Sequence, residues 1–136
     1  TKCHCKTFHL YTNKMYIYMY VYIQFAAAVK MGPVIYFSGI VGDGRLKGYD
    51  QFKNAFEGLE KTLAEAGCTF DDIIDTTFFI VDMKTNTRAL AKAQSEYIKK
   101  PYPTSTWIGT TELVVPGGLC EIKVVCRNPE FKVSKM

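Results

Sequence analysis

The sequence predicts an α+β domain in which two helices cover one face of a single mixed sheet. Three observations indicate this fold: a β-hairpin precedes the first of two helical segments, one strand separates the helices, and two strands follow the second helix. The chain has 136 residues, of which 48% are hydrophobic, so it has the size and apolar content of one globular domain.

The first elements are expected to be an N-terminal arm and the hairpin. Residues 1–14 show no periodicity, which indicates a loose arm. Tyrosines alternate with aliphatic side chains over 15–23, and this period of two predicts a strand. The strand-like pattern continues to Lys30, "KMGP" is a turn, and "VIYFSGI" at 34–40 is the second hairpin strand.

The later elements alternate between the two periodicities. Apolar residues recur at helical spacing from Asp50 until Gly67 ends the first helix. The β-branched and aromatic run "IIDTTFFIV" predicts a strand, and residues 85–99 predict the second helix, with Leu90, Ala93, Tyr97 and Ile98 facing inward. Strands are then expected at 104–110 and in "LCEIKVVCR", separated by a "VVPGG" turn.

The distribution of charge argues against a nucleic-acid partner, although the chain carries a net charge of +4. Residues 1–30 contain four lysines and no acid, so the remaining 13 basic side chains balance all 13 acidic ones in 31–136. Phosphate binding depends on clustered Lys and Arg, and this neutral region predicts none.

The cysteines and the hydropathy pattern bear on location. Five cysteines without a repeated spacing disfavour a disulfide scaffold and favour a reducing compartment, so we expect a cytoplasmic protein, with an organelle as the alternative. No uninterrupted apolar run reaches the roughly 18 residues of a spanning helix, and we expect no membrane partner. Residues 15–29 faintly resemble a secretory signal, but they are rich in tyrosine and lead directly into the hairpin.

Several short motifs have ordinary structural explanations. The "GDGRLKG" loop fits neither a dinucleotide-binding nor a Walker motif, so a polar connection is expected. Cys3, Cys5 and the two histidines, His4 and His9, match no structural zinc spacing, and no metal site is expected. With both histidines in the arm, the hydroxyl cluster in "PYPTSTWIGT" at 101–110 lacks a histidine base and is a poor nucleophile candidate.

The last strand points to a site and to self-association. Its alternation places Glu121 on the face opposite Cys120 and Ile122, away from the helices. A monomer would leave that face in water, so we expect an oligomer that buries it. Glu121 then either pairs with a neighbouring chain or serves a site, and the sequence pattern leaves both open.

Residues 24–130 resemble the Rid (reactive intermediate deaminase) family, also called YjgF. The segments that carry the resemblance are "VIYFSGIVG", "AFEGLEKTLAEAGCTFDDIIDTTFFIVDM", "PYP" and "EIKVV". The resemblance implies a chorismate-mutase-like (ferredoxin-like) fold over 24–136, with residues 1–23 outside it. It also implies a homotrimer whose sheets form a central barrel, with clefts between subunits, and hydrolysis of imines or enamines without metal or cofactor.

The resemblance also implies site residues. Glu121 corresponds to the glutamate that positions water, and Gly39 to the glycine of the "FSG" strand. Phe25 replaces the tyrosine of the cleft, and Ser105 replaces the arginine that clamps the substrate carboxylate in the deaminases. A serine hydroxyl does not replace a bidentate guanidinium fork, so the standard 2-imino acid deaminase activity is not expected.

The remaining implied site residues are Thr106, which offers a second hydroxyl, and Trp107, which either adds an aromatic wall to the cleft or packs between subunits. The sequence therefore predicts a protein that binds or hydrolyses a small imine, enamine or related carbonyl compound, such as a 2-oxo or imino compound. One alternative is a small-ligand binding module without chemistry. Another is an endoribonuclease or translation inhibitor, as described for some family members. An arginine from a neighbouring chain, namely Arg45, Arg88 or Arg127, is the remaining candidate for the missing clamp.

Overall fold

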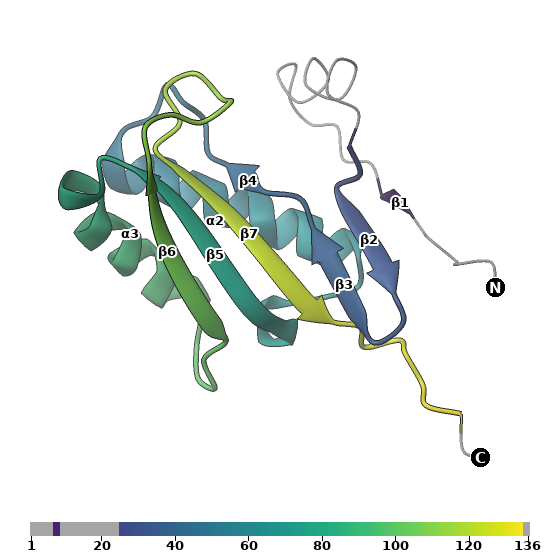
Figure 1. The fold of residues 1–136 in the computed structure, drawn as a ribbon. Helices are drawn as coiled ribbons and strands as arrows, with labels where there is room; N and C mark the ends of the chain where they lie inside the picture. Colours follow the sequence, from purple (N-terminus) through teal and green to yellow (C-terminus); the bar gives the residue numbers. More distant parts are fainter. Residues whose placement is uncertain (1–6, 9–24, 135–136) are drawn as a thin grey trace.

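The computed structural model describes residues 7–8 and 25–134 (Figure 1). Its helices are α2 (Gly48–Glu65), the 3₁₀ helix η1 (Phe70–Asp72) and α3 (Met83–Tyr97). Its strands are β1 (Thr7–Phe8), β2 (Ala28–Met31), β3 (Val34–Phe37), β4 (Ile40–Val41), β5 (Ile73–Val81), β6 (Thr104–Thr110) and β7 (Cys120–Arg127).

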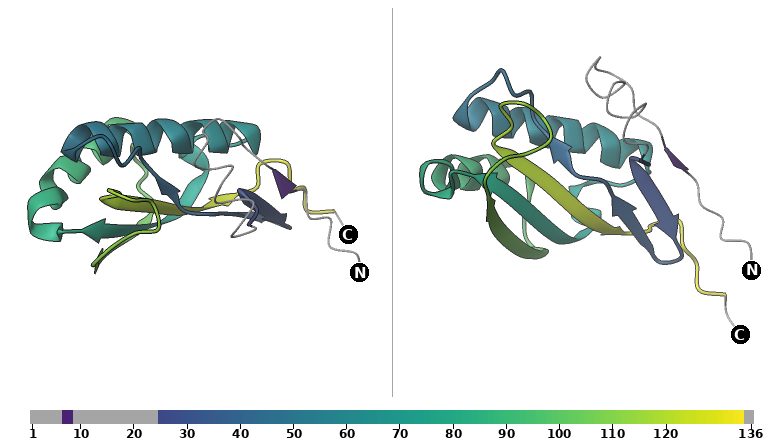
Figure 2. Two further views of the ribbon diagram at one scale, coloured as in Figure 1. Left: turned by 90° about the horizontal axis from the view of Figure 1, so that it is seen from above. Right: turned by 45° about the horizontal axis from the view of Figure 1, so that its top comes forward.

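The strands form one sheet with the order β1-β2-β3-β7-β5-β6, and β4 pairs with β7. The β5–β6 pair is parallel and the other pairs are antiparallel, so the sheet is mixed. Figure 2 shows both α-helices on the same face of the sheet, while no helix or strand of the described residues covers the opposite face. The predicted α+β class, with two helices on one face of a mixed sheet, is confirmed.

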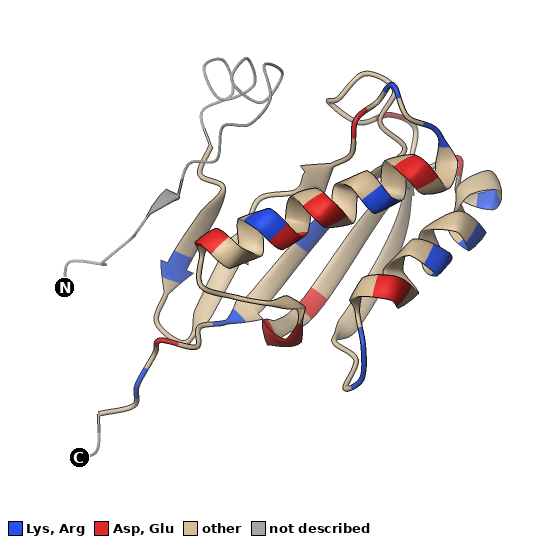
Figure 3. Cartoon of the chain, turned by 180° about the vertical axis from the view of Figure 1, so that it is seen from behind, with Lys and Arg blue, Asp and Glu red and all other residues tan. Residues whose placement is uncertain are grey.

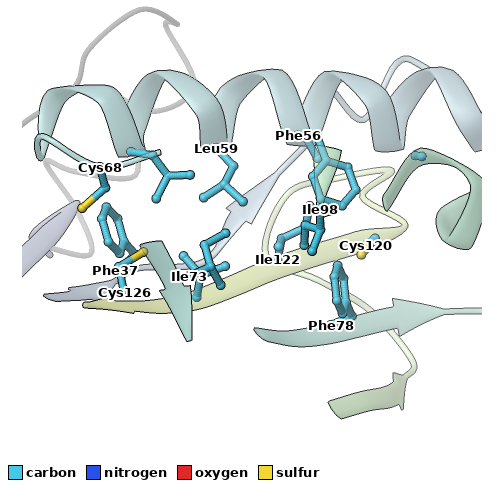
Figure 4. Close-up of a cluster of buried hydrophobic side chains, with 14 of the residues drawn as sticks. Phe37, Phe56, Leu59, Cys68, Ile73, Phe78, Ile98, Cys120, Ile122 and Cys126 are labelled. Atoms are coloured by element: carbon cyan, nitrogen blue, oxygen red, sulfur yellow. The ribbon is translucent and has the colours of Figure 1, made fainter. Parts of the chain in front are cut away.

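The core lies between this face and the helices. Every second side chain of β7, from Cys120 to Cys126, is buried, as expected for a strand covered on one side. Phe56 and Leu59 of α2 pack against the buried side chains of the central strands (Figure 4). Phe56 also stacks on Tyr97 of α3, with ring centroids 5.1 Å apart, which joins the two helices above the sheet.

The second hairpin strand is shorter than predicted. The run "VIYFSGI" is divided, because β3 ends at Phe37 and β4 begins at Ile40. At the break, Ser38 donates its amide to the Ala27 carbonyl at 2.9 Å and its hydroxyl to the Ala26 carbonyl at 2.5 Å. Both strands pair with β7, so the interruption bends the chain locally without changing its neighbour in the sheet.

The N-terminal prediction is partly revised. The short strand β1 lies inside the segment expected to be a loose arm, and its residues pair with Ala28 and Val29 of β2. The strand predicted over 15–23 lies outside the described residues. The first hairpin strand is also shorter than expected, since it begins only at Ala28.

The helix boundaries differ from the prediction by two residues at each start. The first helix begins at Gly48 and the second at Met83. The first helix ends where predicted, because Gly67 adopts a positive φ of 79° and allows the Cys68 amide to donate to the Leu63 carbonyl at 2.8 Å. Neither α-helix in the described part of the chain is both long and apolar enough to span a membrane.

Candidate functional site

Glu121 is a half-buried carboxylate on the open face of the sheet. It lies in the second position of β7, where its register partners are Phe79 of β5 and Val41 of β4. Burial raises the pKa of Glu121 above its usual value, and the positive charge of Lys123 opposes that shift. A carboxyl group with a raised pKa in this setting suits a general base or a group that orients water.

Gly39 provides the space that the Glu121 side chain occupies. A Cβ atom at position 39 would lie 2.0 Å from Glu121 Oε1 and 2.7 Å from its Cγ. Any other residue at this position would therefore force the carboxylate to move. The interruption between β3 and β4 is the feature that brings the two residues into contact.

Phe25 belongs to the same region. It is half-buried and directly precedes Ala26, whose carbonyl accepts the Ser38 hydroxyl. Because Ser38 neighbours Gly39, the backbone at Phe25 is fixed beside the interruption. The structure thus brings two of the predicted site residues, Gly39 and Glu121, into contact, and places Phe25 next to the residue that is bonded to Ser38.

Ser105 and Trp107 lie on β6, at the other side of the sheet. The indole Nε1 of Trp107 donates to Ser105 Oγ at 3.0 Å, and the indole ring lies 5.0 Å from Phe78. Phe78 is buried beneath the helices, so both β6 side chains point to the helix-covered face. The Ser105 oxygen accepts the indole proton, which leaves its own hydroxyl proton free to be donated to a ligand.

Thr106 is the member of the β6 group that shares the face of Glu121. Its register partner is Thr77, which in turn pairs with Lys123 of β7. Since β5 separates β6 from β7, two strand spacings of about 5 Å each lie between Thr106 and the strand of Glu121. Within one chain the predicted residues therefore form two groups that do not converge.

Lys123 is a candidate that the sequence interpretation left without a role. Its side chain lies on the open face, two residues from Glu121, and its Nζ donates to the Phe37 carbonyl at 3.0 Å. The period of two in "EIKVV" already placed it on that face. Its bond to the end of β3 depends on the sheet order, which the pattern does not contain.

Two of the three arginines considered as a substitute clamp have carboxylate partners in the chain. Arg45 pairs with Asp43 through two guanidinium nitrogens, and this arginine lowers the pKa of Asp43 to about 2. Arg127 Nη2 lies 2.7 Å from Asp72 Oδ1. Arg88 is exposed on α3 and has no salt bridge among residues 25–134.

The described residues contain no cluster of His, Cys, Asp and Glu side chains suited to a metal ion. The Cys3, His4, Cys5 and His9 group lies outside them. What the described region does offer is a recessed carboxylate, a nearby lysine, and hydroxyl groups on the edge strand. These groups are suited to forming hydrogen bonds with a small polar molecule and to transferring a proton to it.

Comparison with known proteins identifies relatives along most of the chain. Residues 19–127 match the model of the family described as endoribonuclease L-PSP. The chain is 39% identical over 118 residues to the RutC family protein YjgH of Escherichia coli, covering 82% of this chain and 88% of the relative. A solved structure of protein YjgH aligns with 37% identity and a TM-score of 0.72, covering 82% of this chain and 89% of that one.

A more distant structure shares the fold. RidA from the Antarctic bacterium Psychrobacter aligns with 23% identity and a TM-score of 0.71, covering 76% of this chain and 88% of that one. The family match begins at residue 19, five residues before the boundary expected from the sequence, and ends close to the end of β7.

Proposed function

The chain belongs to the endoribonuclease L-PSP family, the YjgF/Rid group, and from this premise we propose that it binds and hydrolyses a small imine, enamine or related carbonyl metabolite. The proposed sites are clefts between the subunits of a homotrimer. Glu121 orients the attacking water there. The residues proposed to line the cleft are Phe25, Gly39, Ser105, Thr106 and Trp107.

The observation that best supports the proposal is the contact between Gly39 and the Glu121 carboxylate. The absent Cβ leaves the space that the carboxylate occupies. A half-buried carboxylate with a raised pKa is costly to retain, and such groups concentrate at functional sites.

The proposed reaction needs only proton transfers. Water attacks the carbon of the C=N bond while the Glu121 carboxylate accepts a water proton. Return of this proton to nitrogen gives the neutral carbinolamine. Glu121 then takes the hydroxyl proton of the carbinolamine and delivers it to nitrogen, so the C–N bond breaks as the C=O bond forms, and ammonia and the carbonyl product leave. Ser105 and Thr106 would donate hydrogen bonds to the polar atoms of the bound compound.

Trimer formation would bring the two groups of predicted residues together. The open face exposes apolar side chains that a partner would cover, including Tyr36 at 47% and Ile108 at 42% exposure. We expect light scattering to give a mass of about 46 kDa, three times the 15.4 kDa chain. A monomer at micromolar concentration would contradict the proposed site, because one chain does not assemble it.

The replacement Glu121→Gln is expected to lower turnover of an accepted imine by about 100-fold or more, since general-base assistance is lost. The measurement is ammonia release from a panel of freshly generated imines. Thermal unfolding at pH 7 is the control: because burial raises the pKa of Glu121, its ionisation costs stability as the pH rises through the folded-state pKa. The amide variant should therefore be at least as stable as the parent, and unchanged turnover would exclude Glu121 from catalysis.

The replacement Ser105→Arg is expected to create or increase activity on 2-imino acids by roughly 10-fold or more, because a guanidinium fork binds a carboxylate in two places. The substrates to compare are 2-iminopropionate and a neutral imine of similar size. Ser105→Lys is the matched variant, since it adds the charge without the fork. If the parent and the arginine variant both leave the buffer rate of 2-imino acids unchanged, the deaminase form of the proposal is wrong.

A second candidate is a binding module that uses the same cleft without chemistry. The free hydroxyl proton of Ser105 favours neutral carbonyl ligands in either case. Thermal-shift screening with 2-oxo acids, small carboxylates and neutral carbonyl compounds distinguishes the two. Binding without ammonia release would support the module.

Ribonuclease activity is the third candidate, and the family's name is its main support. Acidic and basic side chains alternate along α2, while α3 carries mainly basic ones (Figure 3). The region 25–134 also contains no histidine for acid–base cleavage. RNA cleavage that persists in Glu121→Ala and through successive purification steps would favour this candidate over the hydrolase.

A further inference from the structure

Two buried thiols lie at the end of the core that is remote from Glu121. Cys68 follows the C-terminal turn of α2, and Cys126 is the last inward-facing residue of β7. Figure 4 shows both side chains at the same end of the buried cluster, and each thiol shifts the pKa of the other. The Cys68 thiol donates a hydrogen bond to the Arg127 carbonyl oxygen, 3.9 Å from Sγ.

The backbone around this pair is fixed from several sides. Cys68 is anchored by its amide bond to Leu63, and Cys126 is the register partner of both Ile35 and Ile73. The adjacent residue Arg127 forms an ion pair with the buried Asp72. A disulfide between Cys68 and Cys126 requires their side chains to rotate until the two sulfur atoms reach the bonding distance of about 2 Å.

We propose that Cys68 and Cys126 form a reversible intramolecular disulfide that fastens the end of α2 to β7 under oxidising conditions. The oxidant is a peroxide or a small disulfide. With a peroxide, the Cys68 thiolate attacks one oxygen and breaks the O–O bond, which gives a sulfenic acid and water once the leaving oxygen is protonated. The Cys126 sulfur then attacks Cys68, the S–O bond breaks, and a second water leaves, so two thiols are oxidised as one peroxide is reduced.

The two cysteines are not equivalent in this sequence of steps. Cys68 is 4% exposed and lies between the exposed residues Gly67 and Thr69, whereas Cys126 is fully buried. Cys126 lowers the pKa of Cys68, whereas Cys68 raises the pKa of Cys126, so Cys68 is the easier thiol to ionise. Cys68 is therefore assigned the first attack and Cys126 the second.

The charged groups around the pair determine how the reaction depends on pH. Burial is the main cause that raises the pKa of both thiols; Asp72 acts in the same direction, while Lys30 and Arg127 lower the pKa of Cys68. Oxidation should accordingly accelerate as the pH rises from 7 toward 9. Cys120 does not compete, because six residues of extended strand, or about 20 Å, separate it from Cys126.

The test is peptide mapping of the full chain after exposure to hydrogen peroxide or oxidised glutathione at pH 8.5, followed by alkylation under denaturing conditions. Trypsin places the three core cysteines on separate peptides, 62–84, 100–123 and 124–127. We expect a cross-link between 62–84 and 124–127 that dithiothreitol reverses. The oxidised protein should melt roughly 5–15 °C higher, since the bond closes a loop of more than 50 residues.

Variants separate this proposal from nonspecific oxidation. Cys68→Ala and Cys126→Ala should each abolish the cross-link and the rise in melting temperature, while Cys120→Ala should keep both. Because core substitutions can impair folding, the parent chain provides an independent test: its cysteines are alkylated before and after reduction, which shows which of them are cross-linked. The proposal is overturned if peptides 62–84 and 124–127 are recovered singly alkylated after oxidation, or if Cys68 links instead to the N-terminal Cys3 or Cys5.

Discussion

Replacing Gln51 by leucine is expected to lower the free energy of unfolding by about 3–5 kcal/mol, because one buried amide satisfies three backbone groups. Its Nε2 donates to the Leu46 and Gly117 carbonyls at 3.0 Å each, and its Oε1 accepts the Leu119 amide at 2.7 Å. Gln51 is completely buried, so leucine fits the volume but leaves these three groups without a partner. Urea denaturation followed by circular dichroism measures the loss.

The matched control for this prediction is Gln94→Leu. Gln94 is half-buried on α3, and its side chain makes no hydrogen bond among the described residues. Its replacement should change the unfolding free energy by less than about 1 kcal/mol. If both variants lost a similar amount of unfolding free energy, the three hydrogen bonds of the Gln51 amide would not be the cause of the loss.

Gln51 also connects the core to the proposed site. The loop after β4 and the loop before β7 approach so closely that a Cβ on Gly44 would lie 1.9 Å from the Pro116 carbonyl oxygen. The Gln51 side chain bonds to both loops and to Leu119, two residues before Glu121. Loss of this bridge should consequently reduce turnover as well as stability.

Replacing Gly39 by alanine is expected to reduce turnover by about 100-fold while changing the unfolding free energy by no more than about 2 kcal/mol. The new Cβ would meet Glu121 Oε1 at 2.0 Å, and the carboxylate is the end of a flexible side chain that can rotate away. The fold therefore tolerates the change, but the carboxylate is displaced from its position. Ammonia release and thermal unfolding, measured on the same preparation, separate the two effects.

Gly58→Ala is the control for the change at Gly39. A Cβ on this α2 residue would lie 3.4 Å from Ile40, an ordinary contact, and alanine favours a helix over glycine. We expect full activity and equal or greater stability. If Gly39→Ala retained the activity of Gly58→Ala, the contact between position 39 and Glu121 would not matter for catalysis.

The sequence predicts the helices and strands of the domain correctly where a single periodicity is strong. The strand over 73–81 and the strand over 104–110 were predicted with the boundaries that β5 and β6 have. The interruption at Ser38 and Gly39 was missed, because "VIYFSGI" has uniform strand character. The chain bends there through bonds to Ala26 and Ala27, which come from another part of the hairpin.

The candidate site shows the same limit of local sequence patterns, which do not contain contacts between distant segments. The pattern of β7 was enough to place Glu121 and Lys123 on the open face. It does not indicate that Gly39 touches the carboxylate, because that contact is made between neighbouring strands far apart in the sequence; only the family resemblance points to Gly39. Ser105 and Thr106 are neighbours in sequence but lie on opposite faces of β6, so only Thr106 shares the face of Glu121.

The sequence by itself determined the α+β class, the family, and the residues that face away from the helices, because each of these follows from local periodicity or from a motif. Only the tertiary structure decided that Gly39 makes room for Glu121, that Gln51 joins two loops, and that Cys68 and Cys126 lie at the same end of the core. The physical reason is that these relations depend on residues far apart in the sequence: 82 positions separate Gly39 from Glu121, 66 separate Gln51 from Gly117, and 58 separate Cys68 from Cys126. Their geometry is set by strand order and helix packing, which no local pattern encodes.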